Sequence, residues 1–285
     1  MCNKLKVKIT ADSVCDLSPE QRERYGLNIL PLYVMLDGKE HRDGVDIVPE
    51  DIYAHVAAGG DLGSTAALSV ADYIEFFGKE LEDCDELVHF HISSSMSSCY
   101  QNACIAAEEV ENVYPIDSAN LSTGIGLLII DACEMAAQGM SAKEIVEEIN
   151  ARRCKVEASF VVDSVNYLHK GGRCSAVAAL GANLLGLKPC IEVADGAMGV
   201  AKKYRGKIGK CLVQYVRERL EGREDIKLNR IFITNSGEFT EDELKAVEDE
   251  VRKYQSFDEI LFSRAGCTVS NHCGPKTLGI LFEKK

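Results

Sequence analysis

The sequence predicts an α/β protein, with a three-layer parallel-sheet domain at the N-terminal end and a two-layer α/β domain with a mixed sheet at the C-terminal end. Short apolar runs alternate with longer amphipathic segments up to about residue 153, the pattern of a parallel sheet covered by helices on both faces. Beyond that point two strand-like segments are joined by Asp195 and Gly196, a hairpin signal that implies antiparallel pairing. The chain has 285 residues, 46% of them hydrophobic, which is enough for two ordinary domains.

A Rossmann-like domain is expected over residues 1–158. Ser18 followed by Pro19 marks one helix start, and Ser141 with Glu144 forms a capping box at another. The small, polar segment 61–69 is predicted to be a surface loop ahead of a helix capped by Ser69. The expected strands are 4–10, 28–36, 87–92 and 113–116, and helices are expected to begin near residues 18, 47, 70, 97, 122 and 141.

The second domain is expected over residues 159–285, with its boundary between 155 and 163 and a ligand cleft between the two halves. Small residues dominate a predicted helix over 176–187, which favours close helix packing and also suits an apolar guest. The segment 270–277 is predicted to be a loop. The other expected strands are 158–162, 189–193, 199–204, 229–234, 259–263 and 278–282, and the other expected helices are 164–170, 208–220 and 240–254.

Five serines lie within residues 93–98, directly after the apolar run 87–92 and directly before the helical pattern. The free N–H groups and the positive dipole end of a helix meet at such a junction, so added hydroxyl groups favour a carboxylate or a phosphate. A helix cap alone needs one serine. The local sequence therefore leaves two interpretations open, a helix cap at Ser97 and a clamp for an anionic group.

Charge and composition exclude several classes of function. The net charge of −13 disfavours nucleic acid and anionic membranes as partners, and no apolar run is as long as a membrane span. The sequence passes from Met1 directly into a strand-like segment, so we expect a cytoplasmic protein. Its twelve cysteines, irregularly spaced, are expected to be free thiols.

Catalytic and metal-binding patterns are weak. The sequence contains no nucleophile elbow and no Walker loop. His89 and His91 alternate along one strand and share a face, but no acid or sulfur ligand is evident beside them, so we expect core or cleft histidines and no metal site. His272 is predicted to lie in a loop and is a better functional candidate than the strand histidines. Asp12, Asp16 and Asp117 follow predicted strands and could be catalytic, although acids at such positions are also common caps and turn formers.

With these residues in view, the chain resembles the DegV family, the fatty-acid-binding proteins of bacterial fatty acid kinase. The resemblance covers nearly the whole length and depends on several segments that occur in the same order. These are TADSVCDL (10–17), LYV (32–34) with RDGVDI (42–47), ISSSMSSCYQNA (92–103), DSANLSTG (117–124), YLHKGGR (167–173) and HCGPKTLG (272–279).

The resemblance implies that the protein binds a long-chain fatty acid and presents its carboxylate to a separate ATP-dependent kinase subunit, which forms the acyl phosphate. It implies no cofactor and no catalytic residue in this chain. The implied carboxylate-binding residues are Thr65, Ser93, Ser94 and His272, with Ser69, Ser97 and Arg173 as further candidates.

The sequence departs from the family pattern in three places. A family Leu-Ser-Gly-Thr reads Met96 to Cys99, the hydroxyl loop after Thr65 lacks a serine and a proline, and Lys276 replaces a small residue. Two other readings stay open: a stand-alone small-molecule kinase or hydrolase that uses Asp12 or His272, and a lipid sensor or carrier without a kinase partner.

Overall fold

The computed structural model describes residues 5–174 and 186–285. The N-terminal half is built on a parallel sheet in the order β2-β1-β6-β7. Every residue of β6 is buried, because helices cover both faces and leave no polar side for alternation. The strands are β1 (Val7–Asp12), β2 (Asn28–Leu30), β6 (Glu86–His91) and β7 (Val113–Asp117).

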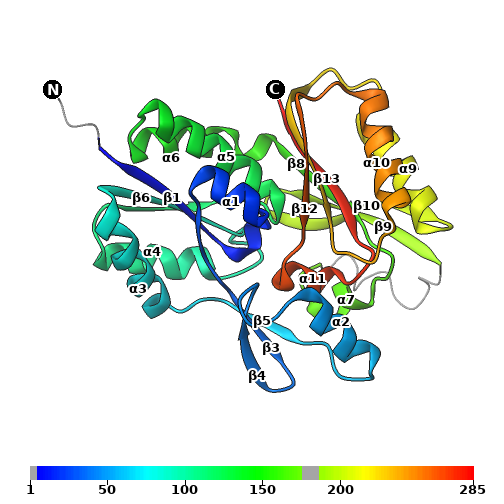
Figure 1. The fold of residues 1–285 in the computed structure, drawn as a ribbon, viewed down its shortest axis with the longest axis horizontal. Helices are drawn as coiled ribbons and strands as arrows, with labels where there is room; N and C mark the ends of the chain where they lie inside the picture. Colours follow the sequence, from blue (N-terminus) through cyan, green and yellow to red (C-terminus); the bar gives the residue numbers. More distant parts are fainter. Residues whose placement is uncertain (1–4, 175–185) are drawn as a thin grey trace.

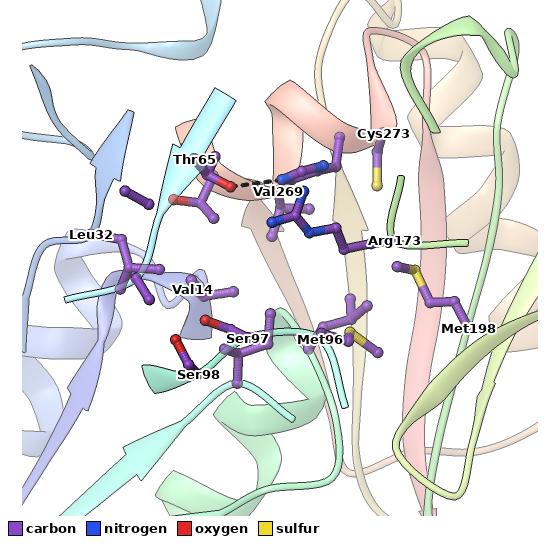
Figure 2. A pocket seen from close by; sticks show the side chains of 16 residues that line it. Val14, Leu32, Thr65, Met96, Ser97, Ser98, Arg173, Met198, Val269 and Cys273 are labelled. Atoms are coloured by element: carbon purple, nitrogen blue, oxygen red, sulfur yellow. Dashed lines mark hydrogen bonds between the residues drawn. The ribbon is translucent and has the colours of Figure 1, made fainter. Parts of the chain in front are cut away.

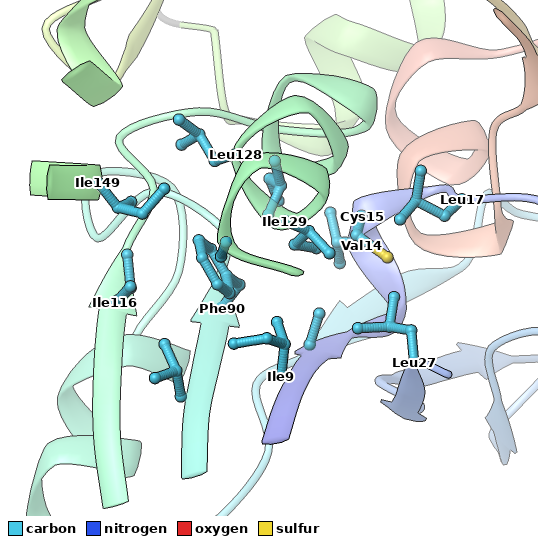
Figure 3. Close-up of a cluster of buried hydrophobic side chains, with 14 of the residues drawn as sticks. Ile9, Val14, Cys15, Leu17, Leu27, Phe90, Ile116, Leu128, Ile129 and Ile149 are labelled. Carbon is cyan, nitrogen blue, oxygen red and sulfur yellow. The ribbon is translucent and has the colours of Figure 1, made fainter. Parts of the chain in front are cut away.

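Helices lie on both faces of this sheet (Figure 1), as the sequence predicts. Leu128 and Ile129 of one helix pack against Ile9, Phe90 and Ile116 of the strands and form the main core (Figure 3). The helices of this half are α1 (Pro19–Tyr25), α3 (Val70–Glu80), α4 (Cys99–Glu109), α5 (Thr123–Gln138) and α6 (Ala142–Arg152), with short 3₁₀ turns η1 (Ser13–Cys15), η2 (Leu81–Asp83) and η3 (Arg153–Lys155).

The C-terminal half is built on a mixed sheet in the order β10-β9-β8-β13-β11-β12, in which β11 and β12 are parallel and the other pairs are antiparallel. Asp195 and Gly196 both have positive φ in the predicted hairpin turn. The elements are β8 (Val156–Val161), β9 (Leu187–Ala194), β10 (Ala197–Arg205), α9 (Ile208–Leu220), β11 (Ile226–Asn235), α10 (Glu241–Tyr254), β12 (Glu259–Arg264) and β13 (Leu278–Lys284).

The segment predicted as one strand over 28–36 is divided between two sheets. Pro31 lies at the break and has no N–H to donate to a continuous ladder. The strands β3 (Tyr33–Leu36), β4 (Lys39–Arg42) and β5 (Ser64–Ala66) form a separate three-stranded sheet in the order β4-β3-β5. The prediction of a loop over 61–69 was therefore wrong at β5, which is too short to show alternation in the sequence. Helix α2 (Pro49–Ala57) follows β4.

The loop predicted over 270–277 was also wrong in its first part, because α11 (Cys267–Cys273) is helical and packs beside α7 (Asn166–Gly171). Its N-terminal N–H groups are capped from a distant part of the chain. The carboxylate of Asp43 accepts from the N–H of Cys267 at 2.7 Å and of Thr268 at 3.1 Å. A cap supplied across more than two hundred residues leaves no local start signal.

A buried ion-pair network joins the two halves of the molecule. Asp131 of α5 interrupts an apolar helix and pairs with Arg230 of β11 at 2.9 Å, with Arg152 at 3.2 Å and with Lys227 at 3.3 Å. A lone buried carboxylate is unfavourable, so its partners from the second sheet specify how α5 lies on that sheet.

Most described cysteines are free thiols, as predicted, and Cys2 lies outside the described residues; the free thiols include Cys15, Cys84, Cys99, Cys104, Cys133, Cys154, Cys190, Cys211, Cys267 and Cys273. Among residues 5–174 and 186–285, no helix has the length and apolar character needed to cross a bilayer.

Gly279 of β13 is expected to be essential for packing in the second sheet. A Cβ added there would lie 2.5 Å from the Ser159 carbonyl oxygen and 2.9 Å from the Phe160 Cβ, both on the neighbouring strand β8. Gly279→Ala should lower the free energy of unfolding by about 1–3 kcal/mol, measured by urea denaturation. Gly199→Ala in β10 is the control, because nothing lies within 4 Å of its added Cβ, and a comparable loss there would contradict the packing argument.

Candidate functional site

A cavity of about 210 Å³ opens at the carboxyl ends of β1 and β6, where successive connections of the sheet run in opposite directions. Ligands of open α/β sheets bind at such switch points. Both halves of the chain supply its walls (Figure 2). The lining residues are Val14, Leu32, Thr65, Ala66, Ala67, Ile92, Met96, Ser97, Ser98, Leu121, Arg173, Met198, Thr268, Val269, His272 and Cys273.

Polar groups gather on part of the wall. The Thr65 hydroxyl of β5 and the His272 Nε2 of α11 are hydrogen-bonded at 2.8 Å, and the exposed Arg173 after α7 lies next to the His272 ring (Figure 2). Burial, together with the nearby Arg173 charge, lowers the pKa of His272 to about 4, so the imidazole is neutral at neutral pH. Arg173 is thus the positive charge among these lining residues.

Ser97 and Ser98 face the same cavity from the start of α4. The Ser97 hydroxyl accepts from the Cys99 N–H at 3.3 Å and donates to the Cys99 sulfur at 3.1 Å. Ser98 occupies the N-cap position without a side-chain cap bond. The predicted cap at Ser97 is therefore wrong by one position, although the Ser97 hydroxyl accepts from the first N–H of the helix and lines the cavity.

The structure does not bring Ser93 and Ser94 to this cavity. The Ser93 hydroxyl donates to the Gly196 carbonyl oxygen at 2.7 Å, and the Ser94 hydroxyl donates to Asp117 at 2.6 Å. A turn after β6, in which the Met96 N–H donates to the Ser93 carbonyl at 2.9 Å, separates these two serines from Ser97. Ser69 lies elsewhere as well, since its exposed hydroxyl caps α3.

Thr268 is a site residue that the sequence did not indicate. Its buried hydroxyl lines the cavity and has no hydrogen-bond partner among the described residues. Thr268 and His272 are four residues apart on α11, so both face the same way. Recognition of helical spacing over 267–273 would have identified it.

The remaining lining is largely apolar, with Leu32, Ile92, Met96, Met198 and Val269 among its side chains. Sulfur-containing and branched side chains of this kind form a surface that suits an alkyl chain. The small-residue helix predicted over 176–187 falls largely on residues 175–185, which lie outside the described part of the chain.

Buried carboxylates hold α11 beside the cavity. Asp16 accepts from the Gly266 N–H at 2.9 Å and from the Ser122 hydroxyl, while Asp43 caps the next two N–H groups. Burial is the main reason why the pKa of Asp16 is raised to about 7. The hydrogen bonds from Ser122 and Gly266 oppose this rise, and the negative charge of nearby Asp43 adds to it.

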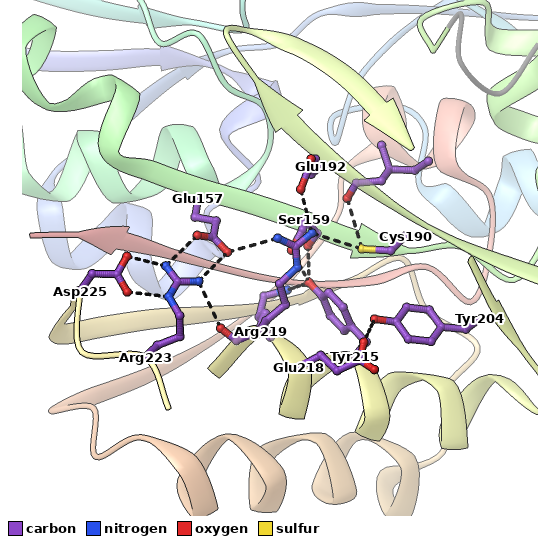
Figure 4. A network of polar contacts seen from close by, with 12 residues as sticks. Glu157, Ser159, Cys190, Glu192, Tyr204, Tyr215, Glu218, Arg219, Arg223 and Asp225 are labelled. Atoms are coloured by element: carbon purple, nitrogen blue, oxygen red, sulfur yellow. Dashed lines mark hydrogen bonds and ion pairs between the residues drawn. The ribbon is translucent and has the colours of Figure 1, made fainter. Parts of the chain in front are cut away.

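The turn formed by residues 93–96 is called the serine turn below. A second, larger cavity of about 560 Å³ lies on its β7 side, and Ser93, Ser94 and Ser95 line it. Most of the residues that line this cavity are polar, and its arginines form ion pairs with carboxylates. Arg219 contacts Glu192 at 3.0 Å and Glu157 at 3.4 Å, within the network that Figure 4 shows. No charge imbalance there favours an anion, so the first cavity is the better candidate site.

Comparison with known proteins places the chain in a family. The model of the DegV family, described as uncharacterised, matches residues 6–285. The chain belongs to the DegV family. A DegV domain-containing protein of Caldanaerobacter subterraneus is 30% identical over 284 residues, covering 98% of this chain and 99% of the relative.

Solved DegV structures share the fold over the whole chain. A DegV family protein from Thermus thermophilus, described by its fatty acid binding, superposes with a TM-score of 0.88 at 29% identity and covers 99% of this chain and 100% of its own. A stearic-acid-binding protein from Eubacterium ventriosum superposes with a TM-score of 0.82 at 27% identity, covering 98% of each chain.

The buried Asp16 should make the stability of this DegV protein depend on pH. Because its pKa is raised from 3.8 to about 7, the stability linked to this group is fully present below about pH 4 and is lost as the pH rises through about 7. Asp16→Asn should remove that slope, so the variant should gain stability relative to the wild type between pH 5 and pH 8.

Urea unfolding at both pH values measures the effect of this change. Asp37→Asn is the matched control, since Asp37 has the same left-handed backbone conformation as Asp16 but is exposed. Parallel pH profiles for the wild type and Asp16→Asn would show that Asp16 does not titrate in this range.

Proposed function

We propose that this DegV protein binds a long-chain fatty acid in the first cavity. The carrying observation is a cavity with hydroxyl groups, an imidazole and the Arg173 guanidinium on part of its wall and apolar side chains over most of the rest. Arg173 forms no ion pair with any residue in the described ranges 5–174 and 186–285. A fatty acid has the same division between a carboxylate and an alkyl chain. The solved relatives described as binding fatty acids support this assignment.

In this proposal the carboxylate lies at Thr65, Ser97, Arg173 and His272. Thr65 and Ser97 supply hydroxyl donors, the His272 Nε2–H donates to the Thr65 oxygen and so directs the Thr65 proton toward the carboxylate, and Arg173 supplies the compensating charge. Hydrogen bonds to a charged group contribute about 1.5–3 kcal/mol each. Ser93 and Ser94, the clamp expected from the sequence, instead stabilise the turn that positions Ser97.

The alkyl chain would lie against the apolar lining. Each buried methylene contributes about 0.8 kcal/mol, so a long chain supplies most of the binding free energy. The ligand should therefore remain bound through purification.

The bound carboxylate is proposed to be the substrate of a separate ATP-dependent kinase that forms the acyl phosphate. The exposed position of Arg173 supports access from outside at the polar part of the cavity. The stand-alone enzyme is less well supported, because Asp12 is only 1% exposed and does not line the cavity, and His272 Nε2 is engaged by Thr65.

Mass spectrometry of solvent-extracted protein tests the ligand. A long-chain fatty acid is expected at about one molecule per chain, since burial of many methylenes makes its release slow. Absence of any acyl chain, together with no uptake of added stearic acid, would refute lipid binding.

Substitution of the hydroxyl groups tests the position of the carboxylate. Thr65→Val or Ser97→Ala should weaken fatty acid affinity about 10–100-fold, because each removes a donor to a charged group. Affinity is measured by competition with a fluorescent fatty acid. Ser94→Ala is the control and should change affinity by no more than about twofold. A larger loss of affinity at Ser94 than at Ser97 would mean that the carboxylate binds at Ser93 and Ser94, as expected from the sequence.

Reconstitution with a bacterial fatty acid kinase tests the partner. Acyl phosphate should form from ATP and bound lipid only when both proteins are present, and Thr65→Val should slow its formation. Product formed by this protein alone would favour the stand-alone enzyme, whereas bound lipid without turnover in the mixture would favour a sensor or carrier.

A further inference from the structure

Three potential metal ligands converge inside the N-terminal half and do not line the first cavity, called the lipid cavity below. Asp12 ends β1, and His89 and His91 lie on β6 beside it, in a register that pairs Thr10 with His89 and Ala11 with Phe90. Continued by one residue, this register sets Asp12 beside His91. One ligand atom from each of the three side chains lies within 4.8 Å of the others.

The cluster is completely enclosed. The exposed fraction is 1% for Asp12 and 0% for both histidines, and none of the three lines the lipid cavity or the polar cavity. The rings of Tyr73 and Phe77 from α3 pack against His89 with centroids 5.7 and 5.3 Å away. An apolar shell of this kind keeps competing water away from a bound cation.

His91 is oriented as a metal ligand would be. Its Nδ1 lies 3.2 Å from the Ile116 carbonyl oxygen, and since a carbonyl oxygen only accepts, Nδ1 carries the proton. The Nε2 atom therefore presents a lone pair. That atom is buried and has no hydrogen-bond partner among the described residues.

Hydrogen bonds also fix the orientation of the other two side chains, His89 and Asp12. The Nδ1 of His89 lies 2.8 Å from the Thr10 hydroxyl oxygen, and its Nε2 lies 3.1 Å from Asp12 Oδ1. The Tyr73 hydroxyl donates to the same Asp12 oxygen at 3.0 Å. Asp12 Oδ2, in contrast, is buried and has no partner within residues 5–174 and 186–285. Metal ligands in proteins are typically fixed by outer hydrogen bonds to a carbonyl, a hydroxyl or a carboxylate.

We propose that Asp12, His89 and His91 bind one divalent transition-metal cation, with zinc as the best match. A cation between these side chains would satisfy Asp12 Oδ2 and His91 Nε2, two acceptor atoms without a partner in the described part of the chain. Two imidazoles and one carboxylate form a common zinc ligand set, whereas magnesium and calcium prefer oxygen ligands throughout. This ligand set leaves a fourth coordination position to be filled by a water molecule. The bound cation would tie β1 to β6 just before residues 93–96.

Metal content of the intact protein is the first test. The protein is purified from zinc-supplemented medium, and a second sample is refolded with zinc chloride or with a chelator. We expect about one zinc ion per chain, a higher melting temperature in the zinc-refolded sample, and a visible absorption band when cobalt replaces zinc. These measurements do not involve lipid, so their failure and the failure of lipid binding are distinguishable.

Variants assign the ligands. His91→Phe should abolish stoichiometric metal and the cobalt band, whereas His41→Phe, which changes a partly exposed histidine on β4, should change neither. Tyr73→Phe keeps the ring and removes the hydroxyl that orients Asp12, so it should weaken zinc affinity about 10–100-fold. If His91→Phe does not fold, the zinc affinity of Tyr73→Phe tests the proposed site instead.

Two results would overturn the proposal. One is metal far below one ion per chain in both wild-type preparations, with no effect of zinc on melting. The other is equal metal loading of the wild type and of folded His91→Phe. Either result would mean that the cluster is a neutral hydrogen-bonded part of the core.

Discussion

The capping of α11 by Asp16 and Asp43 is the interaction on which the candidate site depends. These two carboxylates belong to the N-terminal half, and the three N–H groups that they accept from belong to the C-terminal half. Helix α11 carries Thr268 and His272 to the cavity wall opposite Ser97. Without this capping, the N-terminal N–H groups of a short helix would be buried without partners, which is unfavourable. The same bonds thus satisfy the backbone and assemble the site.

The serine turn separates two cavities of different character. Before the turn, Ser93 and Ser94 donate their hydroxyl protons to Gly196 and Asp117 and line a polar cavity whose arginines are paired with carboxylates. After the turn, Ser97 lines a mostly apolar cavity in which Arg173 is the positively charged lining residue. Five neighbouring serines therefore do not form one site. Ser93 and Ser94, before the turn, form hydrogen bonds within the protein, whereas Ser97, after the turn, lines the first cavity.

Local signals predicted most of the fold. The helix start at Ser18, the capping box at Ser141 and the turn at Asp195 and Gly196 appear where they were expected, because each depends on residues close together in the sequence. The errors arose where distant residues decide the structure. Strand β5 exists because β3 supplies its partner, and α11 exists because Asp43 supplies its cap. Short elements of this kind have too little propensity of their own to be recognised.

The sequence by itself determined the α/β class, the order of most elements, the family, and four of the residues that meet at the cavity: Thr65, Ser97, Arg173 and His272. Motif order and helix-start chemistry are local properties, so they are legible without a fold. Only the tertiary structure decided that Ser93 and Ser94 face another cavity, that Thr268 joins the site, and that Asp12 lies beside the two histidines. Those facts depend on the direction of one turn and on pairing between β1 and β6, which are set by packing of the whole domain rather than by any neighbouring residue.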